Sequence, residues 1–473
     1  MDAPVRIVIL GAGITGLTAG WALSRTKSCD VLILEKSDTI GGLATTFTRG
    51  EFSFDLGSHR LHDDSDPEVA ALIRDLCGSD LVRRERLGLI YLHRKVLPYP
   101  PSAFDVLFAF GQRDALRFGR DWLKARLNRR GQREAQNFED FTIASVGESL
   151  YKRFYKPYAM KLYGLPPRQI AKDPAVSRVR KFTLSSVGRD LRKRLRRKHA
   201  TYLYPAKGIG QIATELYQRF VTGGGRLLKV SRIDGLQIEG DRRVVAIDAM
   251  LTGGNRETIE TDIVISTIPL DVLHHLVALQ SDGDRVPPVD LRWRGLRLLY
   301  LITRNKIPSP HETLYFPESD VLFGRVSELN RYSPVLNQDS RRAVLTIETP
   351  CTCGDEVWNM SDDRLAGHCI KQLQRLHVLR APGSLDEEFF SRRVPTVYPV
   401  YDLGWRRRFE RVYGRLDSVE NLYSIGRTAL FLHCNTDHCM SMALQLARHL
   451  AGGRAKNEWE EVRQRFFDYR VRE

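Results

Sequence analysis

Three glycines near the N-terminus are spaced as in a loop that binds a nucleotide phosphate. Gly11, Gly13 and Gly16 follow an almost continuous apolar run at residues 5–10 and precede residues 17–24, whose apolar side chains have helical spacing. The first glycine permits a tight turn, the second lets the backbone approach a pyrophosphate, and the third lets the helix pack closely against the strand. Unpaired amides at the start of such a helix attract phosphates.

An acidic residue stands where a dinucleotide site needs one. Glu35 follows a second apolar run, residues 31–34, and a carboxylate at that place can accept hydrogen bonds from ribose hydroxyls. The segment has a strand, a glycine loop, a helix, a second strand and an acidic residue in the order that a dinucleotide site needs. It therefore predicts a βαβ unit that binds a dinucleotide. The alternative is a glycine-rich turn without a ligand.

The residues after Glu35 indicate which dinucleotide binds. Gly41 and Gly42 form a glycine pair shortly after the acid, and this arrangement resembles the amine oxidase superfamily of FAD enzymes, which includes protoporphyrinogen oxidase and the carotenoid desaturases. Many members have arginine two residues after the pair, where this chain has Ala44. The resemblance implies FAD as the cofactor, without the contact that this arginine would make.

Three later segments resemble the same superfamily. Residues 224–233 look like the strand whose backbone contacts adenine, and residues 262–269 look like the strand and turn that close the FAD domain. Residues 426–440, with a helix expected from about Met440, resemble the C-terminal flavin segment. A helix that begins there can present N–H groups to the negative charge of a reduced flavin.

A loop with two histidines resembles one branch of the superfamily. Residues 54–62 match the histidine loop of UDP-galactopyranose mutase at Gly57, His59 and His62, and in that family the loop lies beside the isoalloxazine ring. A group that titrates near neutrality suits proton transfer at a flavin, so His59 and His62 are the candidate catalytic residues. The alternative is that both only pack against the loop and bond to its backbone. Further segments that resemble these relatives are residues 154–167, 204–210, 398–402 and 435–438.

Together, these motifs imply a set of cofactor residues and one departure from the family. The residues expected to bind FAD are Gly11, Gly13, Ile14, Thr15, Gly16, Glu35, Lys36, Gly41, Gly42, Leu43, Ala44, Gly57, Ser58, His59, Ile233, Thr267, Gly426, Arg427, Asp437, His438 and Met440. The mutase-like relatives often have Arg-Tyr before the stretch that contains Asn435, where this chain has Leu432, His433 and Cys434. That change is consistent with an altered substrate or with a redox reaction.

The mutase reaction of these relatives uses reduced FAD as a nucleophile toward a sugar carbon. Its nucleotide-sugar substrate carries a diphosphate, which arginines and tyrosines normally bind. The residues expected to bind substrate are Arg178, Arg180, Tyr204, Arg325 and Tyr398, with Arg427 as a further candidate for the diphosphate.

The net charge points to an anionic partner. The 473 residues carry a formal charge of +16, which a fold does not need. Basic residues concentrate at 113–133 and 189–198, where leucines lie among arginines and lysines. Such helices fit an anionic membrane surface, and a solvated helix is the plain alternative. No nucleic-acid-binding motif is visible, so we expect an anionic small substrate or a peripheral membrane contact and no nucleic acid.

The cysteines and the hydropathy pattern indicate an intracellular protein. The seven cysteines are odd in number and scattered, as free thiols would be, and we expect no metal site. Cys351 and Cys353 have the wrong spacing for a zinc pair. The sequence has no stretch of eighteen apolar residues and no secretory signal. We therefore expect a cytoplasmic protein, which the basic helices could bring to the cytoplasmic face of a membrane.

The periodicities predict the elements that position these residues. The expected elements are helices in residues 90–205, strands in residues 226–268, a second sheet from residues 297–302, 322–326 and 344–347, a strand, loop and helix in residues 421–450, and an amphipathic helix at residues 458–469.

We expect an α/β fold with two lobes, a Rossmann-type FAD domain and a mixed helical and β-sheet substrate domain, with the active site between them. The expected boundaries are residues 1–90, 205–285 and 405–455 for the FAD domain, residues 91–204 and 286–404 for the substrate domain, and residues 456–473 for a helical tail. The leading hypothesis is an FAD-dependent oxidoreductase that abstracts a hydride from a sugar-containing or other small substrate. The alternative is a reduced-FAD mutase or isomerase of a nucleotide- or lipid-linked sugar. A flavin-bearing binding protein is a third class.

Overall fold

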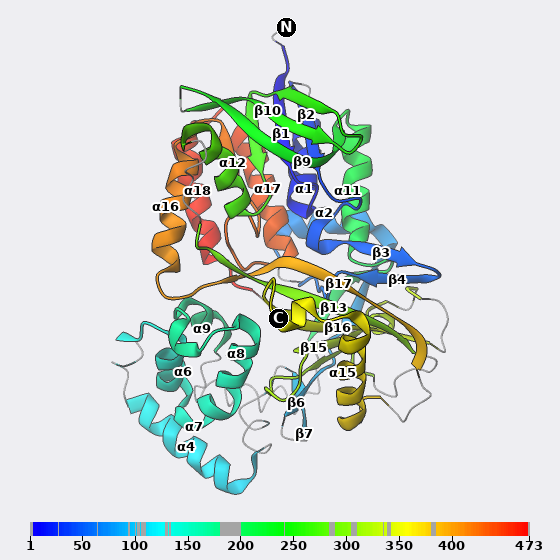
Figure 1. Cartoon of the computed structure of the whole chain (residues 1–473), viewed down its shortest axis with the longest axis vertical. Helices are drawn as coiled ribbons and strands as arrows, with labels where there is room; N and C mark the ends of the chain where they lie inside the picture. Colours follow the sequence, from blue (N-terminus) through cyan, green and yellow to red (C-terminus); the bar gives the residue numbers. More distant parts are fainter. Residues whose placement is uncertain are drawn as a thin grey trace.

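Two seven-stranded sheets dominate the fold, one in each lobe (Figure 1). The computed structural model describes residues 3–26, 28–63, 65–92, 95–99, 101, 105, 110–127, 131, 134–179, 200–240, 242–282, 289–303, 310–333, 335–337, 342–379 and 385–471. The first sheet and its helices form the upper lobe in Figure 1, and the second sheet lies below beside a group of helices. The expected two-lobed α/β fold is confirmed.

The first sheet is built around the glycine loop. β1 (Val5–Leu10) lies between β2 (Cys29–Glu35) and β12 (Ile263–Ser266), and it is parallel to both. The side chains of residues 7–10 are almost fully buried, as in a strand covered on both faces. α1 (Ile14–Ser24) begins directly after the glycine loop, so the predicted βαβ unit is confirmed.

Four further strands extend this sheet. β9 (Arg226–Glu239) runs parallel to β2 and continues into the antiparallel strands β10 (Arg243–Leu251) and β11 (Arg256–Glu260). On the other side, β18 (Leu422–Ser424) pairs in parallel with β12. The strands expected in residues 226–268 and after residue 421 are confirmed.

α1 packs against two helices, α11 (Gly210–Thr222) and α17 (Thr436–Ala451). The expected start of α17, about Met440, was wrong, because the helix begins four residues earlier, at Thr436, with Asn435 as its cap. The Asn435 side chain accepts a hydrogen bond from the backbone of the first turn, and the backbone N–H of Asn435 donates to Nδ1 of His438 at 3.2 Å. The positive end of the helix therefore lies at Thr436.

The second sheet supplies the opposite lobe. Its strands, in spatial order, are β17 (Leu385–Val400), β13 (Arg292–Thr303), β16 (Ala343–Cys351), β15 (Arg325–Glu328), β14 (Thr313–Tyr315), β6 (Gly88–Leu92) and β7 (Lys95–Tyr99). The strands expected at residues 297–302 and 344–347 are confirmed. The strand expected at residues 322–326 begins only at Arg325, because residues 321–324 are irregular.

A group of helices lies beside this sheet. Its members are α4 (Gln112–Leu127), α6 (Phe138–Val146), α7 (Glu148–Leu150), α8 (Lys156–Tyr163) and α9 (Asp173–Arg178). Phe118, Phe138 and Phe141 belong to their shared core. The helices expected between residues 90 and 205 are confirmed for the described part, although β7 and β8 (Thr201–Pro205) occupy its ends. The basic segment 189–198 lies outside the described residues.

The C-terminal segment closes against the first lobe. α18 (Lys456–Gln464) continues into a 3₁₀ turn, Arg465–Asp468, and Trp459 and Phe466 are buried. The expected amphipathic helix is confirmed. Across the part of the chain that the structure describes, no helix is both long enough and apolar enough to cross a membrane.

A short hairpin joins the two lobes. β3 (Thr46–Arg49) and β4 (Phe52–Asp55) pair in antiparallel fashion, and Phe54 of β4 packs edge-on against Tyr300 of β13, with ring centroids 5.1 Å apart. The hydroxyl of Tyr300 also donates to the backbone oxygen of Asp55 at 3.0 Å. The histidine loop leaves from Asp55, so these contacts hold that loop at the junction.

Candidate functional site

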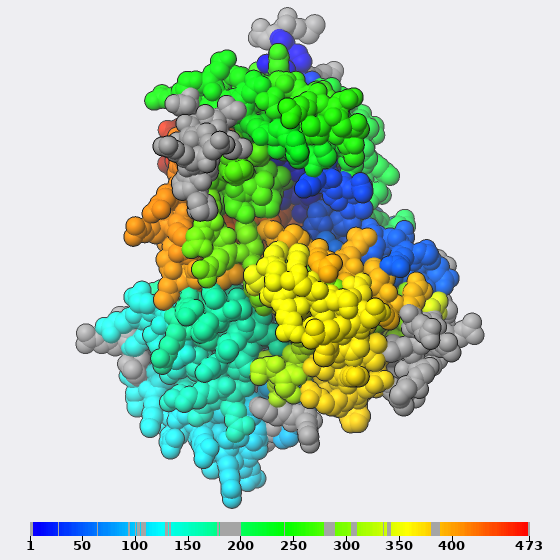
Figure 2. Space-filling model, in the orientation of Figure 1, coloured from blue at the N-terminus to red at the C-terminus, as the bar shows by residue number. Residues whose placement is uncertain are grey.

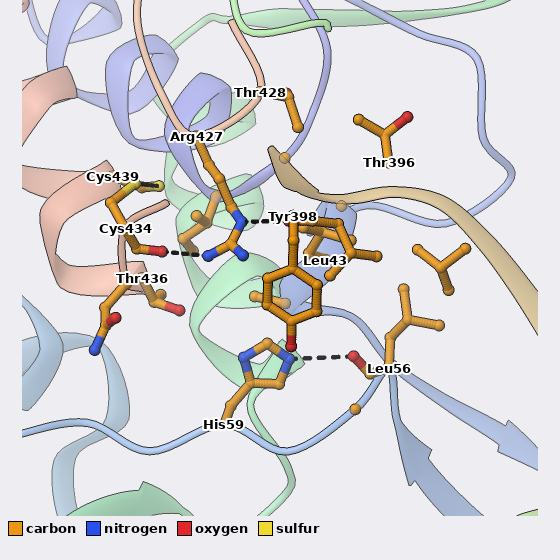
Figure 3. Close-up of a pocket in the computed structure, with 18 of the residues that line it drawn as sticks. Leu43, Leu56, His59, Thr396, Tyr398, Arg427, Thr428, Cys434, Thr436 and Cys439 are labelled. Atoms are coloured by element: carbon orange, nitrogen blue, oxygen red, sulfur yellow. Dashed lines mark hydrogen bonds between the residues drawn. The ribbon is translucent and has the colours of Figure 1, made fainter. Parts of the chain in front are cut away.

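A cavity of about 500 Å³ lies where the glycine loop of the first lobe meets the second sheet (Figure 3). Of the residues expected to bind cofactor or substrate, those that line it are Gly11, Gly13, Ile14, Thr15, Glu35, Gly41, Gly42, Leu43, Ala44, Gly57, Ser58, His59, His62, Thr267, Arg325, Tyr398 and Arg427. The structure thus brings together residues from the whole length of the chain.

The glycine loop shapes one end of the cavity. Gly11 has a φ of +101°, which favours glycine, and its N–H donates to the oxygen of Leu34 at 2.8 Å. A methyl group on Gly16 would lie 2.0 Å from the carbonyl oxygen of Gly11. Gly16 therefore does not line the cavity, but it allows α1 to start close to the loop.

Glu35 stands at the end of β2, beside the glycine loop. Its carboxylate accepts hydrogen bonds from the N–H groups of Ala12 and Ser37, each at 2.6 Å. Each carboxylate oxygen has more than one acceptor position, so these bonds fix the group and leave it able to accept from a ribose. Lys36, the next residue, is exposed and does not line the cavity.

The histidine loop forms the floor between the lobes. Nε2 of His59 lies 3.3 Å from the backbone oxygen of Leu56, which can only accept, so Nε2 carries the hydrogen and Nδ1 is the acceptor of the neutral ring. Burial lowers the pKa of His59, although the neighbouring Asp55 carboxyl opposes that effect. Burial also raises the pKa of Asp55 itself. His59 is therefore held as a neutral imidazole at physiological pH.

A buried ion pair forms the wall on the second sheet. Nε and Nη2 of Arg325 donate to the two carboxylate oxygens of Glu348 at 2.9 and 2.6 Å. Oε1 of Glu348 also accepts from the backbone N–H and the hydroxyl of Ser58, at 3.0 and 2.9 Å. Burial alone would lower the pKa of Arg325, but the carboxylate raises it well above its ordinary value. The pair joins the histidine loop to β15 and β16.

Arg427 stabilises another part of the cavity wall. Its side chain donates to the backbone oxygens of Val397 and Cys434, at 2.9 and 2.5 Å. The guanidinium lies 5.3 Å from the ring centroid of Tyr398, whose hydroxyl end points toward His59 in Figure 3. Among the described residues, no carboxylate forms an ion pair with Arg427, so its positive charge stays available at the cavity.

Several expected site residues do not line the cavity. Ile233 is half-buried in β9, Met440 is fully buried in α17, and Gly426 packs against Thr15. Asp437 accepts from the hydroxyl of Ser65 at 2.9 Å, and His438 stacks on Tyr469.

Of the other expected substrate-binding residues, the structure places one in the core and leaves the side chains of two undescribed. Tyr204 is fully buried and donates to the carboxylate of Asp55, so it belongs to the core beneath the histidine loop. Arg180 and the side chain of Arg178 lie outside the described residues.

Other cavity residues were not predicted. Arg60 lines the cavity and donates to the buried Glu312 at 2.9 Å, and Tyr315 lies beside it. Glu348 could have been found from the sequence, because it is a lone carboxylate within an apolar strand. Cys434 and Cys439 also line the cavity, and the scattered spacing of the cysteines gave no signal for this.

The residues present fit FAD. At the loop, Gly13 faces Gly42, and a methyl group on Gly42 would lie 3.1 Å from Cα of Gly13, so the two segments leave bare backbone for a pyrophosphate. The first amides of α1 and the carboxylate of Glu35 flank that backbone. FAD, when bound, supplies a two-electron acceptor.

The comparison with known families agrees with this geometry. Residues 14–411 match the family described as flavin-containing amine oxidoreductases. The chain belongs to this family. Its cofactor is FAD, and it is an FAD-dependent oxidoreductase.

Solved structures share the fold of this amine oxidoreductase. A reduced UDP-galactopyranose mutase superposes with a TM-score of 0.79 at 21% identity, over 96% of this chain and 94% of the mutase. A protoporphyrinogen-oxidase-like protein from Exiguobacterium sp. 255-15 gives a TM-score of 0.71 at 16% identity, over 95% and 99% of the two chains. Cyclohexylamine oxidase from Brevibacterium oxydans gives 0.64 at 13% identity, over 95% and 99%. At these identities the likeness shows the fold alone.

Two curated relatives match over short stretches. An inactive all-trans-retinol 13,14-reductase from Danio rerio is 40% identical over 67 residues, which are 14% of this chain and 11% of the relative. A 4,4'-diapolycopene oxygenase from Methylomonas is 40% identical over 52 residues, 11% of this chain and 10% of the relative. The chain thus matches only about a tenth of the length of either protein.

Proposed function

We propose that this flavoenzyme removes a hydride from a neutral or anionic, sugar-containing small substrate. The charge of the cavity wall carries the proposal. Among the described residues, the charged side chains that line the cavity are Arg60, Arg325, Arg427, Glu35 and Glu348. Arg325 is paired with Glu348 and Arg60 with Glu312, so Arg427 is the lining cation whose charge no described carboxylate balances. This charge would repel a protonated amine, whereas a neutral or anionic substrate would not be repelled.

Hydroxyl groups on the wall support a substrate with several hydroxyls. Ser58, Tyr315, Thr396 and Tyr398 all line the cavity, and they can donate to and accept from such groups. Apolar side chains of β13 and β17 complete the wall, so a sugar ring could be held by both hydrogen bonds and packing.

His59 is suited to proton transfer in this reaction. When a carbon bearing a hydroxyl loses a hydride, the hydroxyl must also lose its proton. The neutral ring of His59 can accept that proton at Nδ1, because Nε2 is engaged with Leu56. FAD, when bound beside this histidine, would supply the acceptor for the hydride.

A second candidate is the mutase-type reaction, in which the substrate shows no net oxidation. The superposition with a UDP-galactopyranose mutase over nearly the whole chain favours it, as does the presence of His59 and His62 in the cavity. The ion pair between Arg325 and Glu348 argues against the mutase-type reaction, because the carboxylate already neutralises the charge of this guanidinium.

Anaerobic flavin spectroscopy separates the two candidates. Sugars, nucleotide sugars and cyclohexylamine would each be added to the oxidised, FAD-loaded enzyme without any reductant. We expect a sugar-containing compound to bleach the flavin band and the amine to leave it unchanged. Turnover of a nucleotide sugar only after dithionite reduction, with no bleaching, would support the mutase instead. Bleaching by the amine alone would overturn the proposed substrate class.

A further inference from the structure

Two cysteine thiols meet in the wall of the FAD cavity. Sγ of Cys434 lies 3.6 Å from Sγ of Cys439, and both residues line the cavity (Figure 3). Both are nearly buried, at 1% and 5% exposure, so the cavity is their route to a small molecule. A disulfide needs the sulfurs about 2 Å apart, which a shift of about 1.5 Å would achieve.

The surroundings favour a thiolate at Cys439. This residue lies in the first turn of α17, whose N-terminus carries partial positive charge. The hydrogen bond from Cys434, with further ones from Thr15 and the backbone of Arg427, lowers the pKa of Cys439. The same contact raises the pKa of Cys434. Cys439 is thus the thiol suited to attack first, and Cys434 is the thiol that attacks second.

We propose that Cys434 and Cys439 are a redox-active pair that closes to a disulfide in the wall of the FAD cavity. The oxidant is a small-molecule disulfide. The Cys439 thiolate attacks one of its sulfurs, and the displaced thiolate takes up a proton. Cys434 then attacks Sγ of Cys439 and releases the second half as a thiol. One disulfide is reduced to two thiols, and the protein pair is oxidised by two electrons.

Formation of the disulfide would affect the rest of the cavity through one hydrogen bond. Nη1 of Arg427 donates to the backbone oxygen of Cys434 at 2.5 Å. A movement of Cys434 toward Cys439 would therefore shift the anchor of the arginine that lies beside Tyr398. Reduced and oxidised protein should differ in affinity for FAD, which links cellular thiol state to cofactor occupancy.

Mass spectrometry of the FAD-loaded protein tests the pair. After incubation with oxidised glutathione and acid quench, trypsin releases residues 428–448, which contain both cysteines and no third one. We expect this peptide to lose about 2 Da and to resist alkylation, because two hydrogens leave as the disulfide forms. The exposed Cys353 reports in the same sample that the reagent is active.

Two outcomes would overturn the proposal. The first is a peptide that keeps both thiols free while Cys353 becomes glutathionylated. The second concerns Cys434→Ser, in which Cys439 should accumulate the mixed disulfide; an unmodified Cys439 in that variant would exclude it as the attacking thiol. Cys369→Ser, at a buried position of α15 (Asp362–Arg375), is the matched control and should behave as the wild type.

A separate surface, on α4, carries a second inference. Leu116, Leu123 and Leu127 are 77%, 55% and 81% exposed, which is unusual for leucine. Their spacing places them on one stripe of the helix, opposite Phe118, which packs into the core. In the space-filling view, the cyan segment that contains α4 forms the lower left edge of the molecule (Figure 2).

Positive charge flanks this apolar stripe. The exposed basic residues of α4 are Arg113, Arg117, Arg120, Lys124 and Arg126. Its two acids are turned inward, where Asp114 pairs with Arg153 at 3.2 Å and Asp121 accepts from Ser149. Two of the cations, Arg117 and Arg120, reach the same acids at 4.0 and 3.4 Å, yet both side chains remain 67% exposed. The outward face therefore combines leucines with exposed cations.

We propose that this face of α4 binds the surface of an anionic lipid bilayer. Charge complementarity identifies the partner, since lipid headgroups attract the arginines while the leucines enter the boundary of the acyl chains. An RNA would use the cations but would leave the leucines in water. A membrane contact would also bring the enzyme to any lipid-linked substrate.

Vesicle co-sedimentation tests this surface. The full-length protein should bind phosphatidylcholine vesicles that contain phosphatidylglycerol and should bind pure phosphatidylcholine much less. Arg117→Glu with Arg120→Glu should weaken binding by tenfold or more, on the order expected for two reversed charges. Leu116→Ser with Leu123→Ser should weaken it at constant charge. Arg407→Glu with Arg411→Glu, on α16 (Trp405–Asp417), is the charge-matched control.

Unchanged binding in the leucine variant would overturn the lipid contact. Displacement of the protein from vesicles by RNA, with loss of RNA binding in the arginine variant alone, would point to nucleic acid instead. Flavin absorbance of each variant reports that the fold is intact.

Discussion

Arg325 and Glu348 form a two-pronged ion pair in which the carboxylate is 3% exposed and the guanidinium 23% exposed. The pair lies on the second sheet, yet its carboxylate also holds Ser58 of the histidine loop. This charge pair therefore connects the second sheet to the histidine loop at the cavity.

Glu348→Ala should destabilise the protein strongly. The substitution leaves Arg325 buried without its partner and removes both bonds to Ser58, so we expect a loss of about 3–5 kcal/mol in the free energy of unfolding. Urea denaturation measures this value. Glu356→Ala is the control, because the Glu356–Arg364 pair is exposed and its loss should cost less than about 1 kcal/mol. Equal effects of the two substitutions would contradict the structural role of the pair.

His59→Gln should slow flavin reduction by about 100- to 10,000-fold if His59 is the base. Burial lowers the pKa of His59, so the wild-type ring stays neutral at pH 6.5 and the acidic limb of the rate profile should lie below that value. Stopped-flow bleaching across a pH series measures both effects. His368→Gln, at an exposed position on α15, should leave the profile unchanged. A variant that loses FAD rather than rate would instead assign His59 to cofactor binding.

Gly16→Ala should weaken the cofactor lobe, because the added methyl group would lie 2.0 Å from the oxygen of Gly11. Forcing that contact should cost about 1–3 kcal/mol of stability and reduce FAD affinity. Gly367→Ala is a matched substitution within a helix, with open space around the added carbon, and should stabilise by about 0.5–1 kcal/mol. Thermal unfolding followed by flavin fluorescence measures the stability and the FAD binding of both variants. Normal FAD binding in Gly16→Ala would show that α1 can shift away from the loop.

Lys161 should make stability depend on alkaline pH. Its Nζ donates to the backbone oxygens of Phe316 and Phe323 at 2.6 and 3.0 Å, and burial lowers its pKa to about 7. The unfolded chain protonates this lysine at a higher pH than the folded chain does. Stability should therefore rise as the pH increases from about 7 toward 10 and should be lower below pH 7.

Lys161→Met should flatten that rise, which urea midpoints at several pH values would show. Lys371→Met, at an exposed position, should keep the pH dependence of the wild type. An unchanged slope in Lys161→Met would assign the alkaline stabilisation to other groups.

The sequence predicted the cofactor lobe well because its signals are local. The glycine loop and Glu35 lie within one βαβ unit, where spacing along the chain translates directly into geometry. The substrate side was harder to predict. Arg325 and Glu348 come from different strands, and the pair exists only because β15 and β16 align in register. Tyr204 looked like a pocket residue, but the fold places it beneath Asp55.

Cys434 and Cys439 also show a contact that spacing along the chain does not predict. Four residues separate Cys434 from Cys439, and no simple rule for that spacing predicts contact between the sulfurs. Asn435 caps the start of α17 between them, so one cysteine precedes the helix and the other lies in its first turn. Their approach depends on a capping interaction that sequence periodicity does not reveal.

The order of strands in the first sheet governs when this protein can mature on the ribosome. β1 is synthesised first, but its neighbour β12 comes more than two hundred residues later, and the partner of β12, β18, is made only at residues 422–424. The glycine loop must therefore wait for the synthesis of β18 before its sheet is closed. FAD should be captured only after that point, and chains released before residue 422 should lack a stable cofactor lobe.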